Sequence, residues 1–245
     1  MGMTTTARFA GTIPAIEILN VPFVMGTRDD ILAALAPGAK LRALLDEELT
    51  KTGARPIYWM DYGTVVFLSN SDKPIRKPED VKGQKVRVFG KTLGDFVTAL
   101  GGVPTLTSGS EQFLAFQRGT VDAGMTGIGS VKSRKLYEVI DIVTRTEHAK
   151  IEFIMLINDG VWNSLSEEEQ TVVTECGLEA EADLRASIAA VEEDAVQDTL
   201  AQGREVIELT DAEREEWKAA AQPVIDAYLE NSGELGQKVL DALEK

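Results

Sequence analysis

The sequence predicts an α/β fold with parallel strands, and three features of its 245 residues lead to that class. Between residues 85 and 139, short segments rich in β-branched residues alternate with helical segments at tight spacing, which is typical of a parallel sheet. A long helical pattern then runs from residue 166 to about residue 202. No internal repeat and no low-complexity linker divides the chain. A chain of this length forms one large domain or two modest lobes, and two lobes would share strands and several crossings.

The first seventy residues predict three strands and one interrupted helix. Asp29 or Asp30 can cap a helix that runs to about Thr52 and is interrupted at Pro37-Gly38. Aromatic and β-branched residues indicate the strands, which are expected at residues 2–7, 56–62 and 64–70.

The middle of the chain continues the alternation. Gly101-Gly102 ends one predicted helix and Gly119 ends the next. Strands are expected at residues 85–88, 103–106, 121–125 and 151–158, and helices at 93–100, from 110 or 111 to 119, and at 130–139.

A capping box opens the long helix. The Ser166 hydroxyl and the Glu169 carboxylate can each accept from the other residue's backbone N–H. The helix that follows reaches about Gln202 without a proline and would be roughly 50 Å long. It either breaks near Gly177 or crosses two lobes as a strut.

The last segment predicts a short strand and a second capped helix. The strand is expected at residues 205–209, and Thr210 with Glu213 forms the capping box. The helix runs past Trp217, and Pro223 is expected to kink it.

Composition excludes several classes of function. The formal net charge is −15 at pH 7, so phosphate backbones and anionic lipid surfaces are repelled. The single cysteine, Cys176, excludes an internal disulfide, a four-cysteine zinc site and CxxC redox chemistry. The single histidine, His148, excludes multi-histidine metal sites. We therefore expect no cofactor, no metal and no nucleic-acid partner.

Neither a membrane span nor a signal peptide is visible in the sequence. The longest apolar runs are as short as a strand. The N-terminus has no basic region followed by an apolar stretch. Three explanations stay open: a cytoplasmic protein, a mature or engineered form, or a start codon placed too late.

Arg87 lies near the end of a predicted strand, just before Gly90 and a helix. Ligands of open α/β sheets bind at the carboxyl ends of strands, where a guanidinium can hold a carboxylate with two parallel hydrogen bonds. Alternatively, Arg87 lies on the outer face of the strand, alternating with Val86 and Val88. The pattern alone favours the second interpretation.

A second strand end carries small residues. The segment Val121–Gly127 permits close approach of its backbone to a ligand, and Thr126 offers a hydroxyl. A close contact between strand and helix explains the same residues equally well. Aromatic side chains near the strand ends would line an apolar pocket or belong to the core; they are Trp59, Tyr62, Phe67 and Phe89.

No motif demands an enzyme. The sequence has no GxSxG, Walker loop, HExxH or EF-hand pattern. His148 has only Glu147 or Glu152 nearby as an acid or base, and a lone histidine is more often a hydrogen-bonded structural residue.

Taken together, these segments form an ordered set of motifs. Residues 78–88 read P-E-D-V-K-G-Q-K-V-R-V, close to the pattern P-x-D-L-K-G-x-K-I-R-V. The other matching segments are residues 4–9, 19–24, 100–105, 110–111, 116–122 and 136–139, then His148, Trp162 and residues 165–170. The whole chain thereby resembles the periplasmic solute-binding proteins of TRAP transporters, the DctP-type family.

The resemblance implies a two-lobed, periplasmic-binding-protein-like fold with a cleft between the lobes and the long helix spanning both. Lobe I is expected from residues 1–64 plus about 152–191. Lobe II is expected from residues 65–151 plus about 192–245.

The resemblance also implies a function. The protein would be periplasmic and not an enzyme, would bind a small organic acid by lobe closure and would deliver it to membrane permease subunits. It would not insert into the membrane itself. Arg87 would bind the ligand carboxylate. The other expected ligand-binding residues are Thr126, Met125, His148, Thr5, Arg8, Phe67 and Phe89.

Three departures from the family pattern change the expectations. Many members read V-D-G-Q-E-N where this chain reads V-D-A-G-M-T at residues 121–126, so an amide that helps hold the carboxylate is replaced. Residues 62–67 lack the second arginine of sialic-acid-binding members, which indicates a smaller or more apolar ligand. Members also carry a signal peptide and further lobe I elements before the equivalent of Met1, so an N-terminally truncated form with an incomplete lobe I is expected.

Two alternatives to the receptor stay open. One is a cytoplasmic α/β enzyme or sensor that uses the same cleft. The other is a non-functional truncated product.

Overall fold

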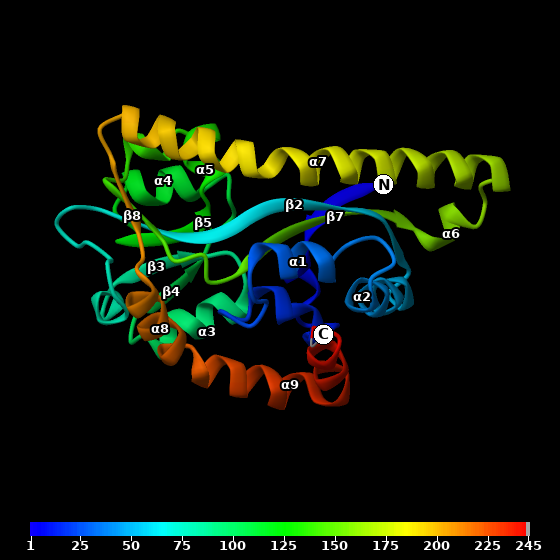
Figure 1. Ribbon diagram of the computed structural model, residues 1–245, viewed down its shortest axis with the longest axis horizontal. Helices are drawn as coiled ribbons and strands as arrows, with labels where there is room; N and C mark the ends of the chain where they lie inside the picture. The colour runs from blue at the N-terminus through cyan, green and yellow to red at the C-terminus, as the bar shows by residue number, and fades with distance from the viewer. Residues whose placement is uncertain (244–245) are drawn as a thin grey trace.

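The computed structural model describes residues 1–243 and shows a mixed α/β molecule with one sheet (Figure 1). Within these residues the strands are β1 (Gly2–Thr5), β2 (Ala54–Ser69), β3 (Lys85–Val88), β4 (Val103–Leu106), β5 (Ala123–Gly127), β6 (Ile142–Arg145), β7 (Lys150–Asn158) and β8 (Glu205–Glu208). The α-helices are α1 (Arg28–Ala34), α2 (Lys40–Lys51), α3 (Lys91–Ala99), α4 (Gln112–Gln117), α5 (Gly129–Ser133), α6 (Asp159–Trp162), α7 (Glu167–Ala201), α8 (Asp211–Ala220) and α9 (Gln222–Asp241). The 3₁₀ helices are η1 (Thr6–Phe9), η2 (Pro14–Asn20), η3 (Pro78–Val81) and η4 (Leu136–Glu138).

Strand β2 connects the two halves of the sheet. Its first part, from Ala54 to Asp61, pairs with β7, and β7 pairs with β1. Its last part, from Val65 to Ser69, pairs with β5 and β6. Between these parts the register with β7 shifts at Asp61–Thr64, which is a β-bulge. The two segments predicted as separate strands are therefore one strand with a bend.

The sheet is mixed rather than wholly parallel. Strands β3, β4 and β5 run parallel to one another, as the alternation predicted, and β6 runs parallel to β8. Strand β2 is antiparallel to each of its partners, and β1 is antiparallel to β7. The prediction missed β6, which is a four-residue strand between two turns.

Helix α7 is unbroken over 35 residues and lies along one long side of the molecule, over β2 (Figure 1). The predicted capping box is present, because Ser166 accepts from the Glu169 N–H and Glu169 accepts from the Ser166 N–H. Gly177 does not break the helix. A Cβ at Gly177 would lie 2.8 Å from Ile57, so the glycine permits the helix to pack closely on β2. The sequence predicted either a break near Gly177 or an unbroken helix that acts as a strut, and the unbroken helix is confirmed.

Three hydrophobic clusters form the core. The first lies around β3, α3 and Trp217, and the second joins η2, α2 and Trp59. The third lies under α4, α5 and the end of α7. Tyr228 and Val239 of α9 belong to the second cluster, so the C-terminal helix packs on the N-terminal segment.

Three predicted helix boundaries were wrong. Thr27, not Asp29 or Asp30, caps α1, and its hydroxyl accepts from the Asp30 N–H. The helix predicted at residues 130–139 is α5 followed by η4, because Lys135 between them has a left-handed φ of 52°. Pro223 lies in the first turn of α9, where a proline needs no N–H partner, so it starts a helix rather than kinking one.

Candidate functional site

The largest cleft bordering the Arg87 strand has a volume of about 980 Å³. One wall is the N-terminal segment of β1 and η1, with Thr5 and Arg8. The facing wall comes from β3, the start of α3 and the loop at residues 107–111. A smaller cavity of about 80 Å³ continues from it toward β5 and β7. Arg87, Phe89 and Arg134 line both spaces.

Arg87 is buried at the floor of the cleft, with 2% of its surface exposed. Its Nε and Nη2 donate to the carbonyl of Thr107 at 2.9 and 2.7 Å, and its Nη1 donates to the carbonyl of Met125 at 2.7 Å. Its guanidinium lies 5.5 Å from the ring centre of Phe89. These contacts satisfy donors but bring no negative charge. Among residues 1–243, no carboxylate forms an ion pair with Arg87.

Burial and, as the smaller cause, repulsion by the Arg134 guanidinium together lower the pKa of Arg87 to about 10. Arg87 therefore stays protonated at neutral pH. A buried cation without a counter-ion loses solvation that its carbonyl partners only partly replace. An anion in the cleft would supply the missing charge, so the site favours an anionic ligand.

The smaller cavity places Thr126 beside aromatic side chains. The Thr126 hydroxyl donates to Ser130 Oγ at 3.1 Å, and the Tyr62 hydroxyl lies 3.1 Å from the same oxygen. The ring centres of Tyr62 and Phe153 are 5.1 Å apart. The cavity therefore has apolar walls and a small cluster of hydroxyl groups at one end.

Small residues bring the walls close to Arg87. A Cβ at Gly124 would lie 3.3 Å from Arg87 Cβ and 3.0 Å from Phe116. The glycine on β5 therefore makes room for the arginine on the neighbouring strand β3. A Cβ at Gly90 would lie 3.1 Å from Ala7, where the strand end approaches the N-terminal wall. These glycines explain why the strand ends predicted from small residues adjoin the cleft.

The structure brings five of the eight predicted ligand-binding residues to the cleft: Arg87, Thr126, Thr5, Arg8 and Phe89. The other three do not line it. Phe67 and the side chain of Met125 lie in the core cluster around β3, and Met125 contributes only its carbonyl, to Arg87.

His148 also lies away from the cleft. Its ring packs 5.3 Å from Phe67 and 5.3 Å from Phe96, measured between ring centres. Its Nδ1 is 2.6 Å from the Thr146 hydroxyl. Burial lowers its pKa to about 3, so it is neutral at physiological pH. His148 is therefore a hydrogen-bonded structural residue, which was the alternative to a ligand-binding role.

Of the two acids considered as partners of His148, Glu147 forms ion pairs with Arg145 and Arg214, and Glu152 is buried on β7.

Sequence reasoning missed Arg134, Phe153 and the loop at residues 107–111. Arg134 carried a readable signal, because Thr126, Ser130 and Arg134 follow at intervals of four, and Ser130 and Arg134 share a helical face. Phe153 had no sequence signal, because it comes to the cleft only through the pairing of β7 with β1, in which it lies opposite Thr5. For the loop at residues 107–111 the sequence predicted only the start of a helix at residue 110 or 111.

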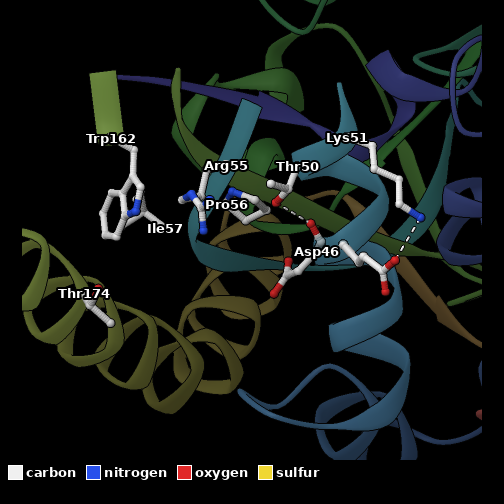
Figure 2. Close-up of a pocket in the computed structure, with 9 residues that line it drawn as sticks. Asp46, Thr50, Lys51, Arg55, Pro56, Ile57, Trp162 and Thr174 are labelled. Atoms are coloured by element: carbon white, nitrogen blue, oxygen red, sulfur yellow. Dashed lines mark hydrogen bonds and ion pairs between the residues drawn. The ribbon is translucent and has the colours of Figure 1, made fainter. Parts of the chain in front are cut away.

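A second cavity of about 530 Å³ lies between the end of α2, the start of β2 and α7 (Figure 2). Its lining includes ion-paired side chains: Lys51 pairs with Glu47 and Glu48, and Arg55 pairs with Asp159. Arg55 also lies 5.4 Å from the ring centre of Trp162. The charges of this cavity are balanced within the chain, unlike those of Arg87 and Arg134.

Comparison with known proteins gives the family. The sequence model described as "DctP: Bacterial extracellular solute-binding protein, family 7" matches residues 1–231. The chain belongs to this family.

Named relatives of this DctP-family protein include the ectoine-binding periplasmic protein TeaA of Halomonas elongata. TeaA is 27% identical over 238 residues, which are 95% of this chain and 69% of TeaA. A TRAP periplasmic solute-binding protein from Desulfovibrio salexigens, solved with bound orotic acid, superposes with a TM-score of 0.90 and 27% identity. That match covers 99% of this chain and 78% of the other.

A TRAP periplasmic solute-binding protein from Roseobacter denitrificans, solved with bound β-D-glucuronate, has a TM-score of 0.91 and 26% identity. The match covers 99% of this chain and 79% of the other. The family resemblance drawn from the motifs is confirmed, and so is the two-lobed α/β fold that it implied.

Proposed function

We propose that this DctP-family protein is the extracytoplasmic solute receptor of a TRAP transporter and binds a small organic acid in the cleft at Arg87. It then delivers the acid to membrane permease subunits. The observation that carries the proposal is the Arg87 guanidinium, buried at the floor of a 980 Å³ cleft without a carboxylate partner among the described residues. A ligand carboxylate supplies the missing charge.

The charge of the cleft supports an anionic ligand. The chain has a net charge of −15, yet the cleft lining holds more cations than anions. Lys91 pairs with Asp95 inside it at 2.5 Å, so these two charges cancel. Arg8, Arg87 and Arg134 form no ion pair within residues 1–243, and Glu111 is the one further acid on the lining. A locally positive cleft on an acidic protein concentrates small anions at the site.

The relatives support the class of ligand. The D. salexigens protein holds orotic acid and the R. denitrificans protein holds glucuronate, and both ligands carry a carboxylate. In this chain Thr126 stands where many members have an amide, and Phe89, Phe153 and Tyr62 give apolar walls. We propose a carboxylic acid with a planar or apolar body, held by its carboxylate on the arginine side.

Lobe closure fits the connection through β2. We propose that residues 1–64 with about 152–191 form lobe I, and that residues 65–151 with about 192–245 form lobe II, of which residues 244–245 lie outside the described part. The bulge at Asp61–Thr64 lies at the boundary. Helix α9 reaches back to lobe I, where the Tyr228 hydroxyl donates to the carbonyl of Ala15 at 2.9 Å, so we treat it as a brace between the lobes.

The proposed location is the periplasm, as the name of TeaA states for that relative. Within residues 1–243, no helix is both long and apolar enough to cross a membrane. We propose membrane permease subunits as the partners that receive the acid, because the matching family is one of solute-binding proteins.

Thermal melting against defined acids tests the proposal. The panel contains orotate, D-glucuronate and pyroglutamate, each paired with a neutral methyl ester or amide of the same skeleton. An acid at one hundred times its dissociation constant stabilises the fold by about 2.7 kcal/mol, which raises Tm by several degrees for a chain of this size. We expect at least one acid to raise Tm and its neutral counterpart to have no effect.

The matched variants are Arg87→Met and Arg118→Met. Arg118 is exposed, lines neither space and forms no ion pair within the described residues. We expect Arg87→Met to abolish the shift and Arg118→Met to keep it. A flat wild-type melt across the panel, or an equal shift with the neutral counterparts, would contradict the proposal.

A further inference from the structure

Arg134 lies beside Arg87 at the cleft and is not among the predicted ligand-binding residues. It follows α5 directly, and it lines both the large cleft and the smaller cavity. Its Nη1 and the Nη1 of Arg87 each lie 3.4 Å from the same atom, Oε1 of Gln112. The Gln112 side chain therefore bridges two guanidinium groups at the floor of the site.

The two guanidinium groups differ in how many donors they have left. Arg87 uses its Nε, Nη1 and Nη2 on the carbonyls of Thr107 and Met125. A guanidinium has five N–H donors, so Arg87 has few to offer a ligand. Among the described residues the Arg134 side chain donates a hydrogen bond only to Gln112, and it is only partly buried. Of the two guanidinium groups, Arg134 therefore has more N–H donors free to bind a ligand.

The loop at residues 107–111 leaves room for the Arg134 guanidinium. A Cβ at Gly109 would lie 2.6 Å from Arg134 Nη1 and 2.8 Å from its Cζ, so any larger residue would displace the guanidinium. Gly109 and Arg134 both line the two spaces. The absence of a side chain at Gly109 thus lets the Arg134 guanidinium lie directly against this loop at the cleft.

Two neighbouring cations without an anion repel each other. Arg134 is the second cause, after burial, of the lowered pKa of Arg87. Within residues 1–243 neither arginine has an acidic partner, although the chain has 40 Asp and Glu residues. A bound carboxylate removes the repulsion and satisfies the free donors in one step.

We propose that Arg134 is a second ligand-binding residue. Its guanidinium donates hydrogen bonds to the ligand carboxylate, while Arg87 lies at the floor of the cleft and adds a second positive charge. This inference rests on the proposed function and goes further, because it moves the direct carboxylate contact from the expected arginine to one outside the recognised motif. Specificity for the anionic group then depends on both residues.

Isothermal titration of the intact chain tests the inference, with orotate, D-glucuronate and pyroglutamate titrated singly. The variants are Arg134→Gln, Arg134→Lys and the control Arg118→Gln, which removes the same charge from an exposed position. We expect Arg134→Gln to weaken binding about tenfold or more, because a charge-assisted pair is lost in a partly desolvated site. Arg134→Lys keeps the charge but loses the guanidinium, so we expect an intermediate loss. Arg118→Gln should bind within about twofold of wild type.

The outcomes separate the inference from the proposed function. If the wild type binds an acid, Arg87→Met abolishes binding and Arg134→Gln weakens it tenfold, both stand. If Arg134→Gln binds as tightly as Arg118→Gln while Arg87→Met does not bind, the Arg134 inference is overturned and the receptor remains. If the wild type binds none of the acids, the proposed function is overturned and the inference falls with it. Melting of the unliganded variants checks that each is folded.

Discussion

Burial shifts the pKa values of two fully buried ionisable side chains in opposite directions, and in both cases it favours the neutral form. His148 is held neutral with a pKa of about 3, among aromatic rings. Glu152 on β7 has its pKa raised to about 8, first by burial, with the neighbouring Lys150 opposing and Asp61 adding to the shift. Both carboxyl oxygens of Glu152 lack a hydrogen-bond partner among residues 1–243. At pH 7 the folded protein therefore keeps a proton on Glu152.

Glu152→Gln tests this protonation state. Between the unfolded pKa of about 4.5 and the folded pKa of about 8, the folded state holds a proton that the unfolded state has lost. The stabilising contribution of this proton is therefore complete below pH 4.5 and is lost as the pH rises toward 8, by at most about 1.4 kcal/mol per pH unit. Glutamine resembles the protonated form and does not titrate.

Urea unfolding at pH 5 and pH 9 measures the effect. We expect wild type to lose more stability than Glu152→Gln between the two values, so that the variant is the more stable protein at pH 9. Equal pH dependence in the two proteins would show that Glu152 titrates normally. The neighbouring ion pair of Lys150 and Asp61 is kept in both proteins and serves as the internal control.

At the scale of single residues, the sequence predicted which strand ends adjoin the cleft better than it predicted which side chains point into it. Arg87 came from a motif, and the structure places it on the floor. His148 came from the same resemblance and Phe67 from the aromatic residues near the strand ends, and both lie in the core. The side of a strand that faces a cleft depends on its pairing partners, which residue types alone do not encode. The spacing of Ser130 and Arg134 was readable in the sequence, but the contacts of Arg134 with Gln112 and Gly109 form only in the folded chain.

Among the elements, the bulge in β2 carries the connection between the halves of the sheet. Gly63 has a φ of 89°, and its N–H donates to Asp61 Oδ1 at 2.7 Å. Thr64 donates its N–H to Glu192 Oε1 on α7 at 3.0 Å, and Arg28 pairs with the other carboxylate oxygen of Glu192 at 2.6 Å. Charged side chains thus clamp the long helix onto the bulge.

Gly63→Ala tests the clamp. A Cβ there would overlap Oε1 of Glu192, and the positive φ strains any residue other than glycine. We expect a loss of about 1–3 kcal/mol from the backbone strain, plus the cost of displacing Glu192 from Thr64 and Arg28. Denaturant unfolding measures the sum.

Gly203→Ala is the matched control for the clamp. Gly203 has a φ of 75°, and a Cβ there would meet no atom within 4 Å, so this variant isolates the backbone strain. Gly63→Ala should cost more than Gly203→Ala. Equal costs would mean that Glu192 adjusts freely and that the clamp adds no stability.

Elements with a local signature were predicted well. The capping boxes of α7 and α8 are present at Ser166 and Thr210, because both partners of each box lie within four residues. Strand β2 was split into two because Gly63 resembled a turn, and only pairing with β7 on one side and β5 on the other shows that it continues. The 3₁₀ helix η2 was missed because six of its seven residues are buried in a continuous run that follows no helical period, and the packing of α9 stabilises it.

At the scale of the whole molecule, a positive cleft lies in an acidic protein. Helix α7 runs past both halves of the sheet, and β2 connects them, so a hinge at the bulge would let the walls approach (Figure 1). The N-terminal wall carries Thr5 and Arg8, and the opposite wall carries Arg87 and Arg134. A ligand that contacts both walls stabilises the closed arrangement by its difference in affinity for the two states. The order of the sequence motifs was enough to predict the family and its two-lobed α/β fold.

The most direct measurement is a crystal structure of the chain with the acid that raises Tm most in the panel. We expect the ligand carboxylate in the cleft, with its oxygens within about 3 Å of the guanidinium nitrogens of Arg134 or Arg87, and its body against Phe89 and Phe153. The acid bound instead in the cavity between α2, β2 and α7 (Figure 2), with neither arginine in contact, would contradict the account.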